Sequence, residues 1–324
     1  MKTTFLKAAM ALLALAAAAL QAHAQDYPQR PVTIVVPFGA GGATDLSART
    51  VAQLLAKQLG QSFVVENKVG ASGMIGMGTV ARAAPDGYTL GWGGNSPMTV
   101  APHLSKTPLY DPSRAFTPVS VAAISSWVVI TRADMPVRTM QDLVAAAKAQ
   151  PGKLTFASSG IGSAPHLLGE VFKSAAGIDI LHVPFKGEVD GFTALLGGQV
   201  DFMFGSTSTS TQMINAGKLK GLAVTTPQRD RAVPNIPTVT EANLPDLTFE
   251  IFFGLLAPAG TPPPVIAKLA AAMKQAVQDP VYRESMEKVG IQAVSSTSAE
   301  FAALLKRHND RWQALIARNR IVIE

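Results

Sequence analysis

The sequence contains no cysteine in its 324 residues. The chain therefore has no disulfide, no thiolate ligand for zinc and no thiol nucleophile. A lipid-anchored amino terminus, which requires a cysteine, is excluded as well. A chain of this length can bury enough apolar surface to be stable without disulfides.

Local signatures of catalytic and metal sites are also missing. The nearest approach to a GxSxG nucleophile elbow, residues 70–74, has methionine in its last position. The histidines after residue 24, at positions 103, 166, 182 and 308, do not form an HExxH pair. No Walker lysine occurs, because Gly152-Lys153 and Gly217-Lys218 are each followed by leucine. These absences argue against an enzyme, a bound metal and a cofactor, although a catalytic triad can assemble from distant residues.

Charge is scarce and spread along the chain. There are 28 basic and 22 acidic residues, and two of the basic ones, Lys2 and Lys7, precede Gln25. No basic run occurs in the remainder, which argues against nucleic acid as a partner. The mild positive excess that remains suits an anionic ligand.

The first 24 residues have the pattern of a secretory signal peptide. Lys2 and Lys7 precede the apolar run Ala8 to Leu20, and small residues, Ala22 and Ala24, flank a cleavage point. The run is shorter than the roughly 20 residues that span a bilayer. We therefore expect export to the periplasm and a mature chain from about Gln25. An uncleaved membrane anchor is the alternative.

The rest of the chain alternates between β-rich runs and amphipathic helical runs. This rhythm predicts an α/β fold of mainly parallel sheets flanked by helices. Two long extended segments, 119–130 and 247–256, interrupt it and are expected to cross between two lobes. The predicted lobes are 25–127 with 250–324, and 128–249. The predicted strands are 32–36, 62–66, 88–92, 154–157, 181–183, 200–204 and 219–224, and the predicted helices include 44–59, 79–83, 139–149 and 164–176.

Two glycine-rich loops, each between a strand and a helix, are the main candidate ligand sites. Neither contains lysine or arginine, so an anion there must be held by backbone N–H groups, hydroxyls and the positive end of the helix dipole. Gly-rich turns are also common packing devices, and that interpretation remains open for each loop. The first loop consists of Phe38, Gly39, Ala40, Gly41, Gly42, Ala43, Thr44 and Asp45. The candidates in the second loop are Ser158, Ser159, Gly160, Gly162, Ser163 and His166.

Other polar residues follow predicted strand ends and are weaker candidates. Asn95 and Ser96 follow one strand, and Ser206 and Thr207 follow another. Lys186 places a cation near the same edge. Each also has an ordinary interpretation, as a turn residue or a solvated side chain. Likewise Asp45 can simply complement a helix dipole, and His166 can serve packing or capping.

Several stretches of the chain resemble the Bug family, the receptors of tripartite tricarboxylate transporters. The resemblance implies a type II periplasmic binding fold and a monomeric, non-enzymatic carrier of a small organic carboxylate. It also implies membrane permease subunits as partners. In that family, loops equivalent to 38–45 and 158–163 hold one carboxylate between the lobes, partly through water. The stretches are 27–45, 84–90, 183–187, 195–201, 237–241 and 256–262.

The chain departs from the family pattern at Gly205, where an acidic residue is often found. The hypothesis that follows is a neutral, roomier pocket that favours a second carboxylate or an aromatic ring. Two other functions stay open at this point. One is a secreted α/β hydrolase that uses Ser163, and the other is a periplasmic sensor module for a carboxylate.

Overall fold

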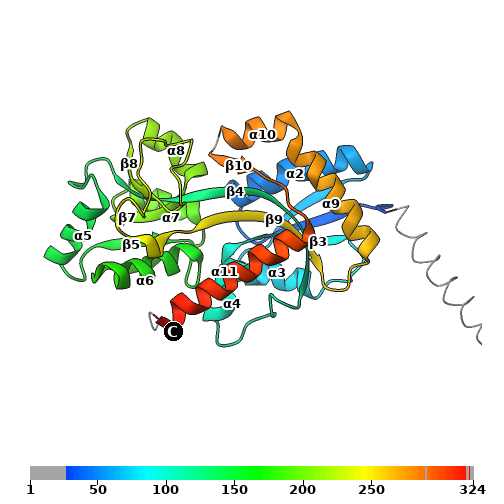
Figure 1. Cartoon of the computed structure of the whole chain (residues 1–324), viewed down its shortest axis with the longest axis horizontal. Coiled ribbons are helices and arrows are strands. Elements are labelled where there is room, and N and C mark those ends of the chain that lie inside the picture. The colour runs from blue at the N-terminus through cyan, green and yellow to red at the C-terminus, as the bar shows by residue number, and fades with distance from the viewer. Residues whose placement is uncertain (1–26, 289, 319–320, 322–324) are drawn as a thin grey trace, which may run out of the picture.

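The computed structural model describes residues 27–288, 290–318 and 321 (Figure 1). Their strands form one curled sheet in the order β2-β1-β3-β9-β4-β7-β5-β6, and β8 and β10 both pair with β4. Helices cover the sheet on both sides, in two groups at its two ends. The proposed signal peptide lies outside the described residues. Within them, no helix is long and apolar enough to cross a membrane.

The first lobe is built on three parallel strands and the antiparallel strands beside them. The order β2-β1-β3 is parallel, and β9 pairs antiparallel with both β3 and β4. The strands are β1 (Val32–Val36), β2 (Phe63–Asn67), β3 (Thr89–Gly94), β4 (Phe116–Arg132), β9 (Glu250–Pro258) and β10 (Ile291–Ala293). The helices are α2 (Ala43–Leu59), α3 (Met74–Ala81), α4 (Ala101–Leu104), α9 (Pro263–Gln278), α10 (Pro280–Glu287) and α11 (Ser298–Arg318), with a π-helical turn, η2 (Ser96–Val100), and a short 3-10 turn, η1 (Ala71–Gly73). A further 3-10 turn, η3 (Pro245–Leu247), precedes β9.

The second lobe repeats this plan on a smaller scale. Its parallel strands have the order β7-β5-β6, and β4 pairs antiparallel with β7 and β8. The strands are β5 (Thr155–Ser158), β6 (Leu181–Pro184), β7 (Phe202–Ser206) and β8 (Leu219–Val224). The helices are α5 (Met140–Ala149), α6 (Ala164–Ala176), α7 (Glu188–Leu196) and α8 (Thr207–Asn215).

One long strand, β4, connects the two lobes. Its residues up to Ser126 pair with β9, whereas Trp127 to Thr131 pair with β7. The chain returns through β9, which begins beside Ser126. Two adjacent strands therefore carry the chain between the lobes, as the extended segments in the sequence predict.

Local sequence explains most element ends. Thr139 and Asp142 form a capping box at the start of α5, with Asp142 N–H donating to Thr139 Oγ1 at 3.1 Å. Gly60 ends α2 in the left-handed conformation (φ 69°). The run Val32–Val36 is almost wholly buried, as expected for a parallel strand covered on both faces.

Close packing fixes α6 against the strands of the second lobe. A Cβ at Gly169 would lie 2.1 Å from Phe156 Cε2, so the helix can approach β5 this closely only with glycine. Phe156, Phe172 and Phe202 are fully buried around this contact, and each contributes about 1.5–3 kcal/mol by leaving water. The middle of α6 is therefore packed closely against β5.

Two predicted boundaries are wrong by several residues. Helix α3 begins at Met74 and not near Thr79, and β7 runs to Ser206 and not to Phe204. Strand β7 also starts later than predicted, at Phe202 and not at Val200, and this later start has a visible cause. The Asp201 carboxylate accepts hydrogen bonds from Thr155 N and Oγ1, at 2.8 and 2.9 Å. Asp201 therefore belongs to the loop that leads into β7 and not to the strand.

Candidate functional site

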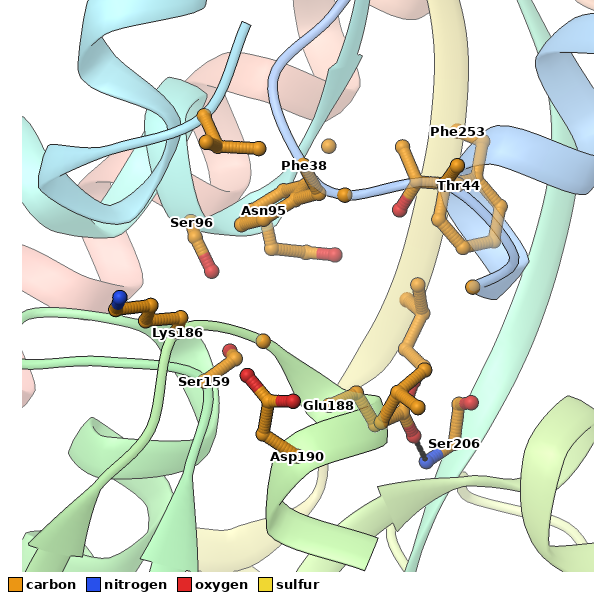
Figure 2. Close-up of a pocket in the computed structure, with 18 of the residues that line it drawn as sticks. Phe38, Thr44, Asn95, Ser96, Ser159, Lys186, Glu188, Asp190, Ser206 and Phe253 are labelled. Atoms are coloured by element: carbon orange, nitrogen blue, oxygen red, sulfur yellow. Dashed lines mark hydrogen bonds between the residues drawn. The ribbon is translucent and has the colours of Figure 1, made fainter. Parts of the chain in front are cut away.

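A cavity of about 370 Å³ lies between the two lobes (Figure 2). Residues of the first lobe form one wall, and residues at the ends of β5, β6 and β7 form the other. Ten of the predicted site residues line it: Phe38, Gly39, Ala40, Gly42, Thr44, Asn95, Ser96, Ser159, Lys186 and Ser206. The cavity also has lining residues that were not predicted: Val69, Gly94, Trp127, Gly187, Glu188, Val189, Asp190, Ile251 and Phe253.

The start of α2 faces this cavity. The helix begins at Ala43 after Gly42, and no side chain caps it. Gly42 and Thr44 line the cavity, so the first turn of the helix borders the enclosed space. An uncapped helix start presents unpaired N–H groups and the positive end of the dipole. This wall can therefore bind an anion without a basic side chain.

Asp45 organises this loop from behind. Its side chain is buried and accepts hydrogen bonds from Gly41 N (3.0 Å), Arg49 Nε (2.9 Å) and Asn67 Nδ2 (2.9 Å). Burial alone would raise the pKa of Asp45, but these hydrogen bonds outweigh it and lower the pKa. Gly41 has φ 89°, which allows the turn that brings its N–H to Asp45. Gly41 and Asp45 do not line the cavity themselves, and the side chain of Ala43 lies outside the described part of the structure.

The second loop uses its N–H groups in a different way. Ala164 N donates to Ser96 Oγ of the first lobe at 3.0 Å, and Gly162 N donates to His166 Nδ1 at 3.0 Å. Ser163 is fully buried and caps α6 by accepting from His166 N. The start of α6 is thus already hydrogen-bonded, contrary to the expectation that both helix starts offer free N–H groups. From this loop, only Ser159 lines the cavity, whereas Ser158, Gly160, Gly162, Ser163 and His166 lie behind it.

Two histidines pack beneath the second loop. The rings of His166 and His182 stack with centroids 3.8 Å apart, and His182 Nε2 lies 2.6 Å from Ser158 Oγ. Burial lowers the pKa of His166, and burial together with His166 and Lys173 lowers the pKa of His182 to about 3. Both rings are therefore neutral at physiological pH and support the loop. These contacts give Ser163 and His166 structural roles. Ser163 is buried as a helix cap, and it does not line the cavity as the nucleophile of a hydrolase would.

Asn95 and Ser96 hold the end of β3 at the cavity. Asn95 Nδ2 donates to Glu250 O at 3.1 Å, and its Oδ1 accepts from Phe252 N at 3.1 Å. The amide therefore ties β3 to β9. Ser96 reaches across to α6 through the bond described above, so both side chains connect parts of the fold while bordering the cavity (Figure 2).

Gly205 and Thr207 point away from the cavity. A Cβ at Gly205 would meet Ile130 and Ser210, each at 2.9 Å, in the packing between the sheet and its helices. Thr207 Oγ1 donates to Asp230 and lies 3.1 Å from Ser125 Oγ. An acidic side chain at position 205 would not enter the cavity, so glycine there neither neutralises nor enlarges it.

The acidic groups of the cavity come instead from the start of α7. Glu188 accepts hydrogen bonds from Ser206 N and, at 2.8 Å, from Thr209 Oγ1. Burial raises the pKa of Glu188, and these hydrogen bonds offset the rise only in part. Asp190 lies two residues further on and directs its carboxylate into the cavity (Figure 2). The pocket that the Gly205 hypothesis describes as neutral is thus lined by two acids and one lysine. The sequence does contain a feature that could have identified Glu188 and Asp190 as site residues. They follow Lys186-Gly187 at a strand-to-helix connection on the same sheet edge.

No group of three or more potential metal ligands occurs among the described residues. The site is thus made of one helix start, hydroxyl groups, aromatic rings, two acids and one lysine.

Comparison with known proteins agrees with this architecture. The family "Tripartite tricarboxylate transporter family receptor" (TctC) matches residues 47–321. The chain is 35% identical over 318 residues to a UPF0065 protein of Bordetella pertussis, covering 98% of each chain. It is 32% identical over 305 residues to the protein BugT of the same organism, covering 94% of each chain.

Solved structures show the same fold. The periplasmic binding protein BugD superposes with a TM-score of 0.86 at 37% identity, covering 92% of this chain and all of that one. MatC from Rhodopseudomonas palustris with bound malate gives 0.85 at 32% identity, covering 90% of this chain and 100% of MatC. An R. palustris protein with adipate gives 0.87 at 31% identity, covering 91% and 99%.

The family resemblance and the two-lobed α/β fold predicted from the sequence are thus confirmed, and the chain belongs to the TctC/Bug family of periplasmic solute-binding receptors.

Proposed function

We propose that this receptor captures a small organic carboxylate in the cavity between its lobes and delivers it to the membrane subunits of a tripartite tricarboxylate transporter. The observation that carries the proposal is the uncapped start of α2, whose first turn borders a cavity lined by both lobes. The relatives solved with malate and adipate support the ligand class.

The lobe boundaries belong to the same proposal. We place the first lobe at 25–127 with 250–324 and the second at 128–249. The change of partner along β4 at Ser126 and Trp127 supports a hinge there. Two strands that cross together permit a rigid-body closing motion around a ligand.

The expected affinity is moderate. A hydrogen bond to a charged group contributes about 1.5–3 kcal/mol, and a helix start adds about 0.3–1 kcal/mol. Three or four such bonds, less the cost of association, correspond to a Kd of about a micromolar. This affinity allows the ligand to be released to a membrane partner.

The location and the partner rest on the sequence and the family. Residues 1–24 serve as a cleaved signal peptide in this proposal, so the receptor acts in the periplasm. The protein has no catalytic role and needs no cofactor. Its partners are the carboxylate and the permease subunits.

Thermal shift and isothermal titration test ligand capture. The purified protein is titrated with succinate, malate, adipate, butanoate and 4-aminobutanoate, each paired with the amide of the same skeleton. A carboxylate that binds only the folded state raises the melting temperature by mass action, whereas its amide has no such effect. Equal responses to acids and amides, or no response to any acid, would contradict the proposal.

A further inference from the structure

The cavity wall opposite α2 carries two acidic side chains. Glu188 and Asp190 lie in the first turn of α7, and both line the cavity. Figure 2 shows the Asp190 carboxylate directed into the space between Ser159 and Glu188. The first lobe thus presents the positive end of a helix, and the second lobe presents negative charge.

Protein groups do not neutralise this acidic wall completely. Glu188 is hydrogen-bonded to Ser206 N and Thr209 Oγ1, neither of which carries a charge. Within the described part of the chain, Asp190 has no hydrogen bond or ion pair, and Lys186 forms no ion pair with either acid.

Acids in a first helical turn also complement the helix dipole. That effect accounts for acids at these positions in the sequence. It leaves the Asp190 carboxylate facing the ligand all the same, and the Glu188 carboxyl, whose pKa is raised by burial, lies beside it on the cavity wall.

Aromatic rings complete the surroundings. Phe38, Trp127 and Phe253 line the same cavity. Trp127 is nine-tenths buried (9% exposed), and its indole N–H has no hydrogen-bond partner among the described residues, so packing alone holds the ring. Aromatic faces attract cations within about 6 Å of the ring centre. Rings and carboxylates together are typical surroundings of an ammonium group.

From this arrangement we infer that the ligand is an amino carboxylate, with its carboxylate at the start of α2 and its ammonium group beside Glu188 and Asp190. This inference rests on the proposed function, because it assumes that the carboxylate binds in this cavity. A plain dicarboxylate would place its second negative charge against the two acids, and like charges brought together disfavour binding.

The test compares ligands of equal length by isothermal titration at pH 7.5. The two sets are butanoate, succinate and 4-aminobutanoate, and pentanoate, glutarate and 5-aminopentanoate. The common α-amino acids are added to cover other positions of the ammonium group. We expect the tightest amino carboxylate to bind at least about tenfold more strongly than any dicarboxylate.

The variant Glu188→Gln with Asp190→Asn removes both charges and keeps the shape of the side chains. The change Glu188→Gln is not expected to disturb the fold, because a glutamine amide oxygen can still accept from Ser206 N. The matched control is Asp134→Asn with Asp179→Asn, which removes two exposed acids from the same lobe. The cavity variant should lose most of the preference for amino carboxylates, whereas the control should keep it.

The outcomes separate the two proposals. If dicarboxylates bind most tightly, or if Glu188→Gln with Asp190→Asn keeps the wild-type selectivity, the inference is overturned while carboxylate capture stands. If no carboxylate of either kind binds, both are overturned. If amino carboxylates bind most tightly, and if this preference is lost in Glu188→Gln with Asp190→Asn but kept in the control, both the proposed function and the inference are supported.

Discussion

The two glycine-rich loops look alike in sequence and differ in how their N–H groups are used. At the first loop, α2 starts without a side-chain cap and borders the cavity. At the second, Ser163 caps α6 and Ser96 of the other lobe accepts a hydrogen bond from Ala164 N. The first loop can therefore bind an anion directly, whereas the second supports the fold and the contact between lobes. Each variant below tests one side of this difference.

The largest effect is expected from Gly42→Val in the first loop. Gly42 has an ordinary φ of −82°, and nothing lies within 4 Å of a Cβ placed there, so valine fits without backbone strain. Its side chain would occupy space beside the free N–H groups of α2. Loss of one or two hydrogen bonds to the charged ligand should weaken binding about 10–100-fold, measured by isothermal titration.

The control for this variant is Ala145→Val, which adds the same kind of bulk on an exposed face of α5. It should bind like the wild type. Gly41→Val is a poorer probe, because φ at Gly41 is 89° and any side chain there is strained. Unchanged affinity in Gly42→Val would remove the first loop from the ligand site.

The second largest effect concerns pH and the second loop. The His182 imidazole has a pKa of about 3 in the folded protein, against 6.5 for the free side chain. As the pH falls below about 6.5, the unfolded chain takes up this proton and the folded chain does not. Stability should therefore decrease from pH 6.5 towards pH 3, by up to about 1 kcal/mol per pH unit for this residue.

Urea unfolding of His182→Gln at several pH values measures this contribution. The variant should show a shallower decrease than the wild type, while His308, whose pKa falls to about 4, keeps its contribution in both proteins. Gly42→Val should keep the wild-type slope, because the first loop contains no histidine. Equal slopes in His182→Gln and the wild type would show that this ring is not held neutral by the fold.

The sequence predicts the fold better than the site. Element order, the crossing segments and the capping box of α5 all follow from local patterns, such as the buried β-branched run at 32–36. Loop position is predictable too, because loops after parallel strands meet at one sheet edge. These features depend on residues that are close in the chain.

What each loop residue contacts depends on distant residues. The Ser96–Ala164 bond joins positions 68 residues apart, and Glu188 meets Ser206 only because α7 packs beside β7. The side of the sheet that Gly205 faces could not be predicted either, since it depends on the register of β7 with β4. No spacing rule in the sequence encodes these contacts.

A smaller effect is expected from Ser163→Ala, which removes the cap of α6. Loss of a helix cap costs about 0.5–2 kcal/mol of stability. Because Ser163 does not line the cavity, affinity for the ligand should stay within about twofold of wild type. Thr139→Ala, which removes the exposed cap of α5, is the matched control. Weak binding with intact stability would restore Ser163 as a ligand contact.

The smallest effect is expected from Ser96→Ala, which removes the acceptor for Ala164 N. A hydrogen bond of this kind contributes about 1 kcal/mol, so closure and ligand binding should weaken about fivefold. Ser72→Ala gives the necessary comparison, since Ser72 Oγ donates to Ile161 O across the lobes at 2.6 Å but does not line the cavity. If Ser96 acts through closure, both variants weaken binding to a similar extent, and both increase the radius of gyration of the ligand-bound protein in X-ray scattering. A loss confined to Ser96→Ala, without a change in shape, would mean that Ser96 contacts the ligand and that both loops take part in binding it.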